Sequence, residues 1–225
     1  MSRKTWIILG VIVLLIAAGG GAWYYFSSDD DDAPSSTAAA TSTGPIYEPL
    51  PTDHTFGNPK AKVTVIEYAS PTCPVCASFM TTLYPKLKRD YIDKGRIFYV
   101  YRTFLRNPDD VAAEKLARCL PKDKYMAFND LLFRNQQKWD YEFGVPTPDG
   151  VHAALLELVG NMGMSSADAD RCIADKKDED AIVKVGVDGE AKYKVGGTPT
   201  LVINGQGEAG FEDFFARLDA ALAKS

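Results

Sequence analysis

Apolar residues follow different spacings along the 225-residue chain, and each spacing predicts a different kind of element. Residues 6–26 form one uncharged run, and residues 63–68 and 97–104 form short β-branched and aromatic runs. Residues 107–193 instead carry apolar positions three and four residues apart. Short runs between turn residues are typical of buried strands, whereas the second spacing is typical of helices. The pattern predicts an α/β domain that contains a long helical segment.

The two short runs and the segment between them form a βαβ unit. Its strands are therefore expected to be parallel and covered by helices. After the helical segment, residues 200–204 predict a strand, Asn204-Gly205 predicts a hairpin turn, and residues 208–211 predict an edge strand. A helix at residues 211–223 is expected to close the chain.

The predicted domains are a thioredoxin-sized α/β domain at residues 53–104 and 196–225, and an inserted helical domain at residues 105–195. Within the insertion, residues 178–195 fit two elements. Valines 183, 185 and 187 alternate as in a strand, yet the segment is charged and its neighbours are helical. Periodicity alone leaves both a strand and a helix open there.

Residues 1–26 predict a transmembrane anchor. At about 1.5 Å per residue, the uncharged run is long enough to span a hydrocarbon core of about 30 Å. Arg3 and Lys4 precede the run and four aspartates at 29–32 follow it, which favours a cytoplasmic N-terminus and a folded part outside. A cleaved signal peptide ending near Gly20-Gly21-Ala22 is the alternative.

Composition limits the partners and the compartment. Residues 27–52 are rich in Asp, Ser, Thr, Ala and Pro and predict a flexible linker. The net charge of −5 argues against a nucleic-acid partner. Four cysteines, an even number, suit an oxidising compartment if the chain is exported.

The predicted strand at residues 63–68 leads into a pair of cysteines. A short turn ends the strand, and Cys73-Pro74-Val75-Cys76 opens a segment whose apolar positions 79, 83 and 87 predict a helix. A C-x-x-C motif at a helix N-terminus after a strand is the setting in which this motif carries redox chemistry.

The chemistry depends on the Cys73 thiolate. Unsatisfied N–H groups and the positive end of the helix dipole favour the charged sulfur, so the pKa of Cys73 is expected to fall. Cys76 lies one turn further on and can close a disulfide with Cys73. Pro74 fits an early helical position because its missing N–H has no partner there. The motif predicts an exposed, low-pKa sulfur with a resolving partner beside it.

Two other interpretations of the cysteine pair are weighed against redox activity. Half of a zinc site would need two more ligands, and the remaining cysteines and histidines are scattered through the sequence, at Cys119, Cys172, His54 and His152. An inert structural disulfide is the other interpretation. We favour redox activity and expect neither a metal nor a cofactor.

Separated features of this sequence resemble the DsbA-like branch of the thioredoxin superfamily, the extracytoplasmic thiol–disulfide oxidoreductases. The cysteine motif resembles the redox motif, and Gly197-Thr198-Pro199-Thr200 resembles the cis-proline loop. Glu67, six positions before Cys73, resembles the buried acid under the motif. The helical insertion stands where this branch carries one. The resemblance covers roughly residues 57–223 and implies a thioredoxin fold with an inserted all-helical domain.

The resemblance implies a substrate-binding surface. Pro199 would be cis and close to the sulfurs, with an ordinary turn as the alternative. Thr198 would offer backbone groups to an extended substrate peptide, and Pro74 and Val75 would belong to the same surface.

Glu67 and the second cysteine pair have two interpretations each. Glu67 would be a buried carboxylate with a raised pKa that relays protons for Cys76, and a solvent-facing strand glutamate is the alternative. Some members of the branch carry a second disulfide in the helical block, which favours a structural disulfide between Cys119 and Cys172. Closing a loop of roughly 50 residues, it would add about 3–4 kcal/mol; two buried free cysteines are the alternative.

Two departures from the branch bear on redox direction. Strong oxidants often carry His where this chain has Val75, and Thr before the cis-proline, as at Thr198, is common in reductive or isomerising members. We expect a Cys73 pKa between about 3.5 and about 7 and a less oxidising couple than that of a strong oxidant.

The sequence thus predicts a membrane-anchored enzyme of the bacterial cell envelope, with its folded part in the periplasm or otherwise outside the cytoplasmic membrane. It is expected to be a monomer that introduces disulfides into exported proteins with cysteines, and to be reoxidised by a quinone-linked membrane oxidase. An envelope reductase or isomerase, fed by a membrane thiol reductase, is the alternative. A non-catalytic holdase chaperone is a third interpretation.

Overall fold

The computed structural model describes residues 47–145 and 147–225. The predicted anchor or signal peptide at residues 1–26, and most of the predicted linker, lie outside the described residues. Within the described ranges, no helix has both the length and the apolar content that crossing a bilayer requires. The described residues belong to one folded unit, Pro45–Ser225.

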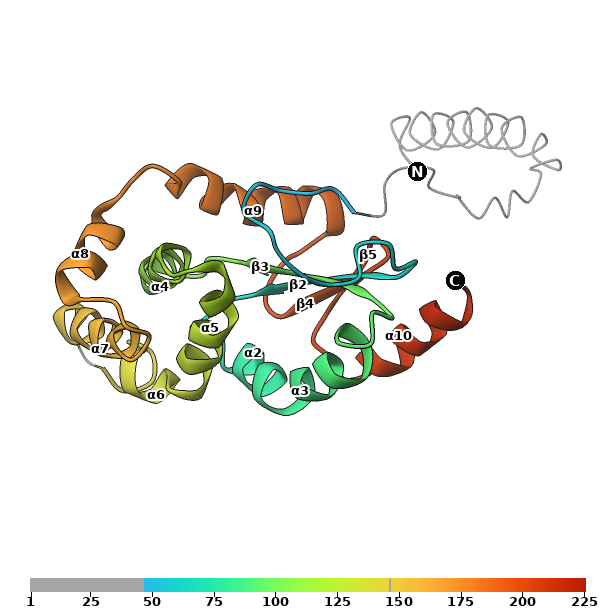
Figure 1. Ribbon diagram of the computed structural model, residues 1–225, viewed down its shortest axis with the longest axis horizontal. Coiled ribbons are helices and arrows are strands. Elements are labelled where there is room, and N and C mark those ends of the chain that lie inside the picture. The colour runs from blue at the N-terminus through green and yellow to red at the C-terminus, as the bar shows by residue number, and fades with distance from the viewer. Residues whose placement is uncertain (1–46, 146) are drawn as a thin grey trace, which may run out of the picture. The chain divides into compact units, whose positions relative to one another are not determined.

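A five-stranded sheet forms the centre of this unit, in the order β1-β3-β2-β4-β5 (Figure 1). Its strands are β1 (His54–Gly57), β2 (Thr64–Ala69), β3 (Phe98–Thr103), β4 (Thr200–Ile203) and β5 (Gln206–Ala209). β2 and β3 are parallel and all other neighbours are antiparallel. The predicted parallel pair is confirmed. The predicted hairpin is present, but its second strand is Gln206–Ala209 and not residues 208–211, and the hydrophobic pattern does not anticipate β1.

Side chains of the central strands alternate between the two faces of the sheet. On one face, Val65, Ala69 and Tyr99 join a large apolar core. On the other, Ile66 and Tyr68 join a smaller one. Glu67 lies between Val65 and Ala69 on the same face, so its carboxyl group is buried within the larger core.

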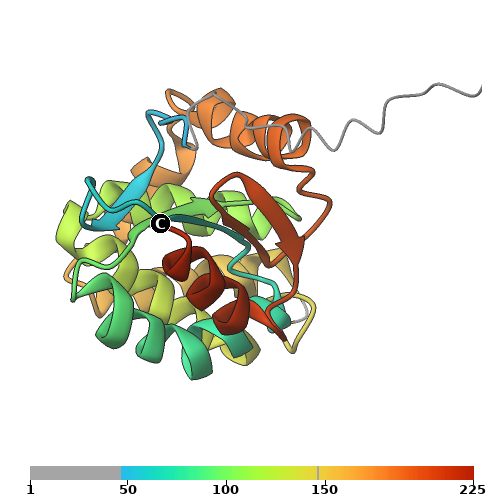
Figure 2. The ribbon, with the colours of Figure 1, turned by 90° about the vertical axis from the view of Figure 1, so that its right-hand side faces the viewer.

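Helices cover both faces of the sheet and extend beyond one end of it (Figures 1 and 2). One face is covered by α9 (Glu179–Tyr193), and the other by α2 (Pro74–Ser78), α3 (Tyr84–Leu87) and α10 (Phe214–Ala223). The remaining helices form the helical block: α4 (Pro108–Cys119), α5 (Tyr125–Arg134), α6 (Gln136–Trp139), α7 (Pro148–Gly160) and α8 (Ser166–Ala174). Asn107, Thr147 and Ser165 cap α4, α7 and α8 by accepting a backbone N–H on their side chains.

The segment after the cysteine motif is not the single regular helix that its apolar spacing predicts. π-helical turns at Phe79–Leu83 and Lys88–Ile92 flank α3. Pro85 has no N–H to donate to the preceding turn, and the N–H of Tyr84 reaches back to the carbonyl of Phe79. Leu83, one of the apolar positions of the predicted helix, is only half-buried.

The ambiguous segment at residues 178–195 is mainly a helix, α9. Its buried residues Ile182, Val185 and Gly189 are spaced by three and four, and Val185 packs with residues of the sheet. Val183 and Val187 are exposed, so the alternating valines do not mark one buried face. A Cβ at Gly189 would lie 2.7 Å from the Tyr68 ring, so glycine is what permits the helix to approach the strand this closely.

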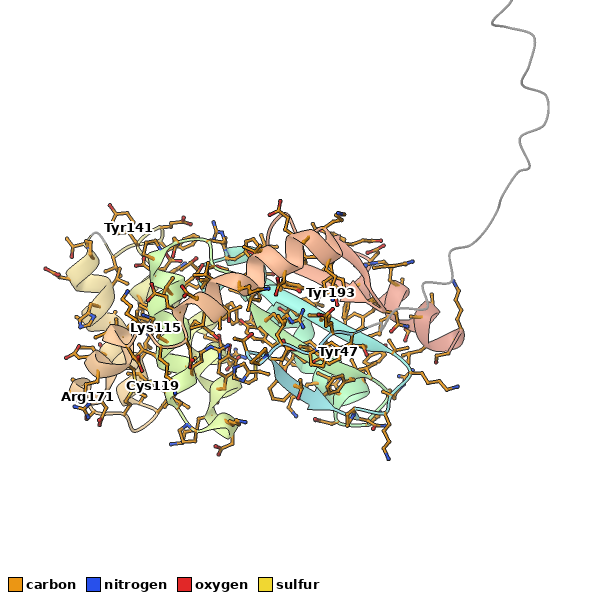
Figure 3. The ribbon with its side chains drawn as sticks, turned by 90° about the horizontal axis from the view of Figure 1, so that it is seen from above. Tyr47, Lys115, Cys119, Tyr141, Arg171 and Tyr193 are labelled. Atoms are coloured by element: carbon orange, nitrogen blue, oxygen red, sulfur yellow. A yellow bond between two sulfur atoms is a disulfide. The ribbon has the colours of Figure 1, made fainter. Side chains whose placement is uncertain are left out.

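The start of the described chain is held to the same face as α9. Arg102 of β3 forms a buried ion pair with Asp53, with 2.6 Å between Nε and Oδ1. Tyr47 donates its hydroxyl to Asp53 over 2.6 Å. Figure 3 shows Tyr47 and Tyr193 over the sheet. The chain therefore enters the folded unit on the face opposite α2.

Candidate active site

Cys73 is the N-cap of α2, with φ −82° and ψ 118°. Its sulfur accepts a hydrogen bond from the backbone N–H of Cys76, with 3.3 Å between Sγ and N. Its S–H donates to the carbonyl of Thr198 over 3.3 Å. The Thr198–Pro199 peptide bond is cis, and neither Cys73 nor Cys76 is in a disulfide. The fold thus brings the motif and the Thr198-Pro199 loop together, with the site in its dithiol form.

The environment of Cys73 favours its thiolate. Its pKa is lowered to about 6, chiefly by a hydrogen bond from the Cys76 side chain. Thr198 and the backbone N–H groups of Cys76 and Val75 add smaller contributions, while burial acts in the opposite direction. A sulfur with this pKa is largely ionised at neutral pH, which makes it both a nucleophile and a good leaving group.

The prediction of an exposed sulfur is wrong in degree. Cys73 is only 4% exposed because the Thr198 carbonyl lies against its sulfur. Val75, in the same turn, is 46% exposed.

Cys76 has the opposite environment. It is fully buried, and burial, the hydrogen bond to Cys73 and the charges of Cys73 and Glu67 all raise its pKa. Cys76 stays a thiol while Cys73 ionises. A group that removes its proton is needed whenever its sulfur must act as a thiolate.

Glu67 lies within this core and is completely buried. Its pKa is raised from 4.5 to about 8, chiefly by burial; a hydrogen bond from Tyr99 lowers the pKa, and the negative charge of Cys73 raises it. A carboxyl group with a pKa near neutrality can both take and give a proton. The solvent-facing alternative is therefore excluded.

Asp110, in the first turn of α4, holds the turn that precedes Cys73. Its carboxylate accepts hydrogen bonds from the Ser70 hydroxyl at 2.8 Å, from the Thr72 N–H at 2.9 Å and from the Arg106 N–H at 2.7 Å. All the side chains at 70, 72 and 110 are fully buried. The sequence identifies Asp110 only as an acidic residue near the start of a predicted helix, so it does not predict the contact between Asp110 and the turn before Cys73.

Gln136, at the start of α6, supports the motif from another side. Its Nε2 donates to the carbonyls of Pro71 and Cys73 over 2.7 and 2.9 Å. Arg106 donates from Nη1 to the carbonyl of Thr72 over 3.1 Å. No local pattern marks these residues, because their partners lie more than 30 positions away.

Cys119 ends α4 and Cys172 lies in α8, both in the helical block. Figure 3 shows Cys119 away from the sheet. The two sulfurs are 2.11 Å apart and form a disulfide that joins the end of α4 to α8. These two cysteines are therefore not available to complete a metal site together with Cys73 and Cys76. Within the described ranges, no three side chains among His, Cys, Asp and Glu are grouped as a metal site requires.

Comparisons with known proteins bear on this arrangement. A family model described as Thioredoxin matches residues 50–219. Proteins named as protein-disulfide oxidoreductases in Rickettsia bellii and Rickettsia typhi are 31% and 35% identical to this chain, over 77% and 68% of its length. The chain spans 66% and 55% of the length of these two relatives.

The fold is also similar to that of a solved structure. The crystal structure of alpha-DsbA1 from Wolbachia pipientis matches with a TM-score of 0.69 and 28% sequence identity. The match covers 78% of this chain and 94% of that chain. The similarity extends over both the sheet and the helical block.

Proposed function

Because the chain belongs to the thioredoxin family, in its DsbA-like branch, we propose that it is a thiol–disulfide oxidoreductase acting through Cys73 and Cys76. The observation that carries the proposal is the Cys73 sulfur at the N-cap of α2, with a lowered pKa and the Thr198-Pro199 loop against it.

In the proposed reaction, a substrate thiolate attacks Cys73 Sγ of the oxidised pair. The Cys73–Cys76 bond breaks, and Cys76 leaves as a thiolate that must take a proton. A second substrate thiolate then attacks the substrate sulfur of the mixed disulfide and releases Cys73. The low pKa of Cys73 favours this release, because a more acidic thiol leaves faster.

We propose Glu67 as the proton relay for Cys76. Burial raises the pKa of both groups, and the charge of Glu67 raises the pKa of the Cys76 thiol further. One proton shared between the two groups avoids two negative charges in the core. The substrate-binding surface is assigned to Thr198, Pro199, Pro74 and Val75. The exposed Val75 and the proximity of Thr198 to Cys73 support this assignment.

The proposed direction is oxidation, that is, the introduction of disulfides into exported proteins. The reduction potential of the purified protein, measured by equilibration with glutathione, tests it. A value near −120 mV supports the oxidase, whereas a value near −270 mV supports the reductase on the scale of known thiol oxidoreductases. The Cys73→Ser variant, which has no thiol at this position, is the control for glutathione exchange.

A reductase or isomerase of the envelope is the second candidate. The observation that favours it is Val75, which supplies neither charge nor a hydrogen bond to the Cys73 thiolate. A Cys73 pKa of about 6 is closer to the value of about 7 in thioredoxin than to the value of about 3.5 in DsbA. A non-catalytic holdase predicts instead that Cys73→Ser retains full activity in cells.

We also propose that residues 1–26 anchor the protein in the cytoplasmic membrane, with the folded unit outside. The linker would be residues 27–44, shorter than the predicted 27–52, because the folded unit begins at Pro45. The redox partner would then be a quinone-linked membrane oxidase, or a membrane thiol reductase for the second candidate. The cysteine usage and the charges that flank residues 6–26 support this topology. External protease added to spheroplasts is expected to degrade the folded unit, and protection from it would overturn the topology.

A further inference from the structure

The two oxygens of the Glu67 carboxyl group have different surroundings. Oε2 accepts a hydrogen bond from the hydroxyl of Tyr99. Oε1 is buried and has no hydrogen-bond partner among the described residues. One oxygen is thus held by a phenol, and the other is free to carry a proton inside the core.

Tyr99 is held rigidly at this position. It is fully buried on β3, opposite Val65 of β2 and therefore diagonal to Glu67 on the same face of the sheet. The rings of Phe56 and Tyr84 pack on its ring, with centroid distances of 6.2 and 5.6 Å. These contacts from β1 and α3 keep the Tyr99 hydroxyl directed at the carboxyl group.

The hydroxyl is also the only group among the main influences on Glu67 that stabilises its charge. Burial and the negative charge of Cys73 both favour the protonated acid, and Tyr99 opposes them. Tyr99 itself keeps its proton, because burial and the charge of Glu67 raise its own pKa well above 10.0. A neutral donor of this kind can hold Oε2 whether or not Glu67 is ionised.

We propose that Tyr99 is a positioning residue for proton transfer: its hydroxyl holds Oε2 of Glu67, so that Oε1 is the oxygen that exchanges the proton with Cys76. This inference rests on the proposed function, in which Glu67 is the proton relay for Cys76. It adds the residue that selects the reacting oxygen and stabilises the carboxylate left behind.

The step balances without any further reactant. When a substrate thiolate bonds to Cys73 Sγ, the electron pair of the Cys73–Cys76 bond goes to Cys76 Sγ. The proton on Oε1 of Glu67 passes to that sulfur and leaves a carboxylate that accepts from Tyr99. In the reverse direction, Oε1 takes the proton from the Cys76 thiol, and the resulting thiolate attacks Cys73 Sγ of the mixed disulfide. The bond between Cys73 and the substrate breaks, and the substrate leaves as a thiolate.

The test is the titration of Glu67 in the reduced full-length protein, followed by NMR of ¹³C-labelled glutamate carboxyl groups, with Glu67→Gln to assign the signal. In Tyr99→Phe the carboxylate loses its donor, so the midpoint is expected to rise by about one pH unit or more. The pH profile of disulfide exchange is expected to shift in the same direction, which a merely structural loss would not produce.

Tyr101→Phe is the matched control. Tyr101 is a fully buried tyrosine two residues further along the same strand, but its hydroxyl donates to Asn129, not to Glu67. Removing it is expected to leave the Glu67 midpoint within a few tenths of a pH unit of wild type. Equal shifts in the two variants would overturn the inference, because the effect would then follow from losing any buried hydroxyl.

If Tyr99→Phe does not fold, 3-fluorotyrosine introduced at position 99 supplies a second measurement. Its more acidic phenol is a stronger donor, so the Glu67 midpoint is expected to fall. An unchanged midpoint in the folded variant overturns the inference. Failure of this inference can be distinguished from failure of the proposed function. Absence of thiol exchange in the wild-type protein would overturn the proposed function, whatever the Glu67 titration shows.

Discussion

The carboxylate of Asp110 accepts a hydrogen bond from the backbone N–H of Thr72, with 2.9 Å between Oδ1 and N. Asp110 belongs to the first helix of the helical block, and Thr72 immediately precedes Cys73. One buried side chain therefore joins the helical block to the turn that carries the reactive sulfur. The block does more than enlarge the protein, because it fixes the backbone from which the motif begins.

Asp110→Asn is expected to lower the free energy of unfolding by about 1–3 kcal/mol, because an amide NH₂ replaces an oxygen that faces hydrogen-bond donors. Thiol exchange is expected to slow as the turn before Cys73 loosens. Urea unfolding and glutathione exchange rates check the two effects. Asp109→Asn is the control: it removes the same charge from the same helical turn, so an equally large loss there would assign the effect to the helix dipole.

The contrast between Cys73 and Asp110 shows what the sequence can predict. The strand before Cys73 and the helix after it are encoded by contiguous residues, so the sequence alone predicts the motif and the elements that flank it. Glu67 can also be recognised from the sequence as a candidate site residue, because a carboxylate within an apolar strand is unusual. Asp110 and Gln136 reach the turn before the motif through tertiary contacts that span more than 30 positions, and no local pattern marks those contacts.

Two elements show the limits of periodicity. β1 is four residues long, and its residues alternate only between half-buried and exposed, so its sequence lacks a clear alternation of apolar and polar residues. In α9, the valines alternate as in a strand although two of them are exposed, whereas the buried positions follow the helical period. Packing of α9 against the sheet favours the helix there, and periodicity alone gives no information about that packing.

Val75→His is expected to lower the pKa of Cys73 from about 6 by roughly one unit, because a cationic imidazole would favour the thiolate. The shift is limited by solvent, since Val75 is 46% exposed. Thiolate absorbance near 240 nm, followed against pH, measures the midpoint. Val75→Thr, which is similar in size and uncharged, is expected to change it little, and a comparable shift in that variant would contradict the electrostatic explanation.

Glu67→Gln is expected to make the reduced protein more stable at alkaline pH. The pKa of Glu67 is raised from 4.5 to about 8, so between these values the folded state binds a proton that the unfolded state has lost. Stability therefore falls as pH rises through this window, on the order of a few kcal/mol. The neutral amide removes that dependence.

Urea unfolding of wild type and Glu67→Gln at pH 4 and pH 9 measures the effect. The difference between the two proteins isolates Glu67 from other buried acids whose pKa is also raised, such as Asp140. We expect similar stabilities at pH 4 and a clear advantage for the variant at pH 9. A constant difference at both pH values would mean that Glu67 does not change its proton occupancy on folding.

Gly189→Ala is expected to destabilise the protein by about 1–3 kcal/mol, because overpacking forces α9 away from the sheet. The added Cβ would lie 2.7 Å from the Tyr68 ring, which the β-sheet holds in place. Gly160→Ala is the control: it is also a helical glycine, and its Cβ would meet nothing within 4 Å. That change is expected to be neutral or to stabilise by up to about 1 kcal/mol, since alanine is the better helix former. Thermal unfolding of both variants checks the pair, and equal effects would show that helix propensity, not the contact with Tyr68, governs position 189.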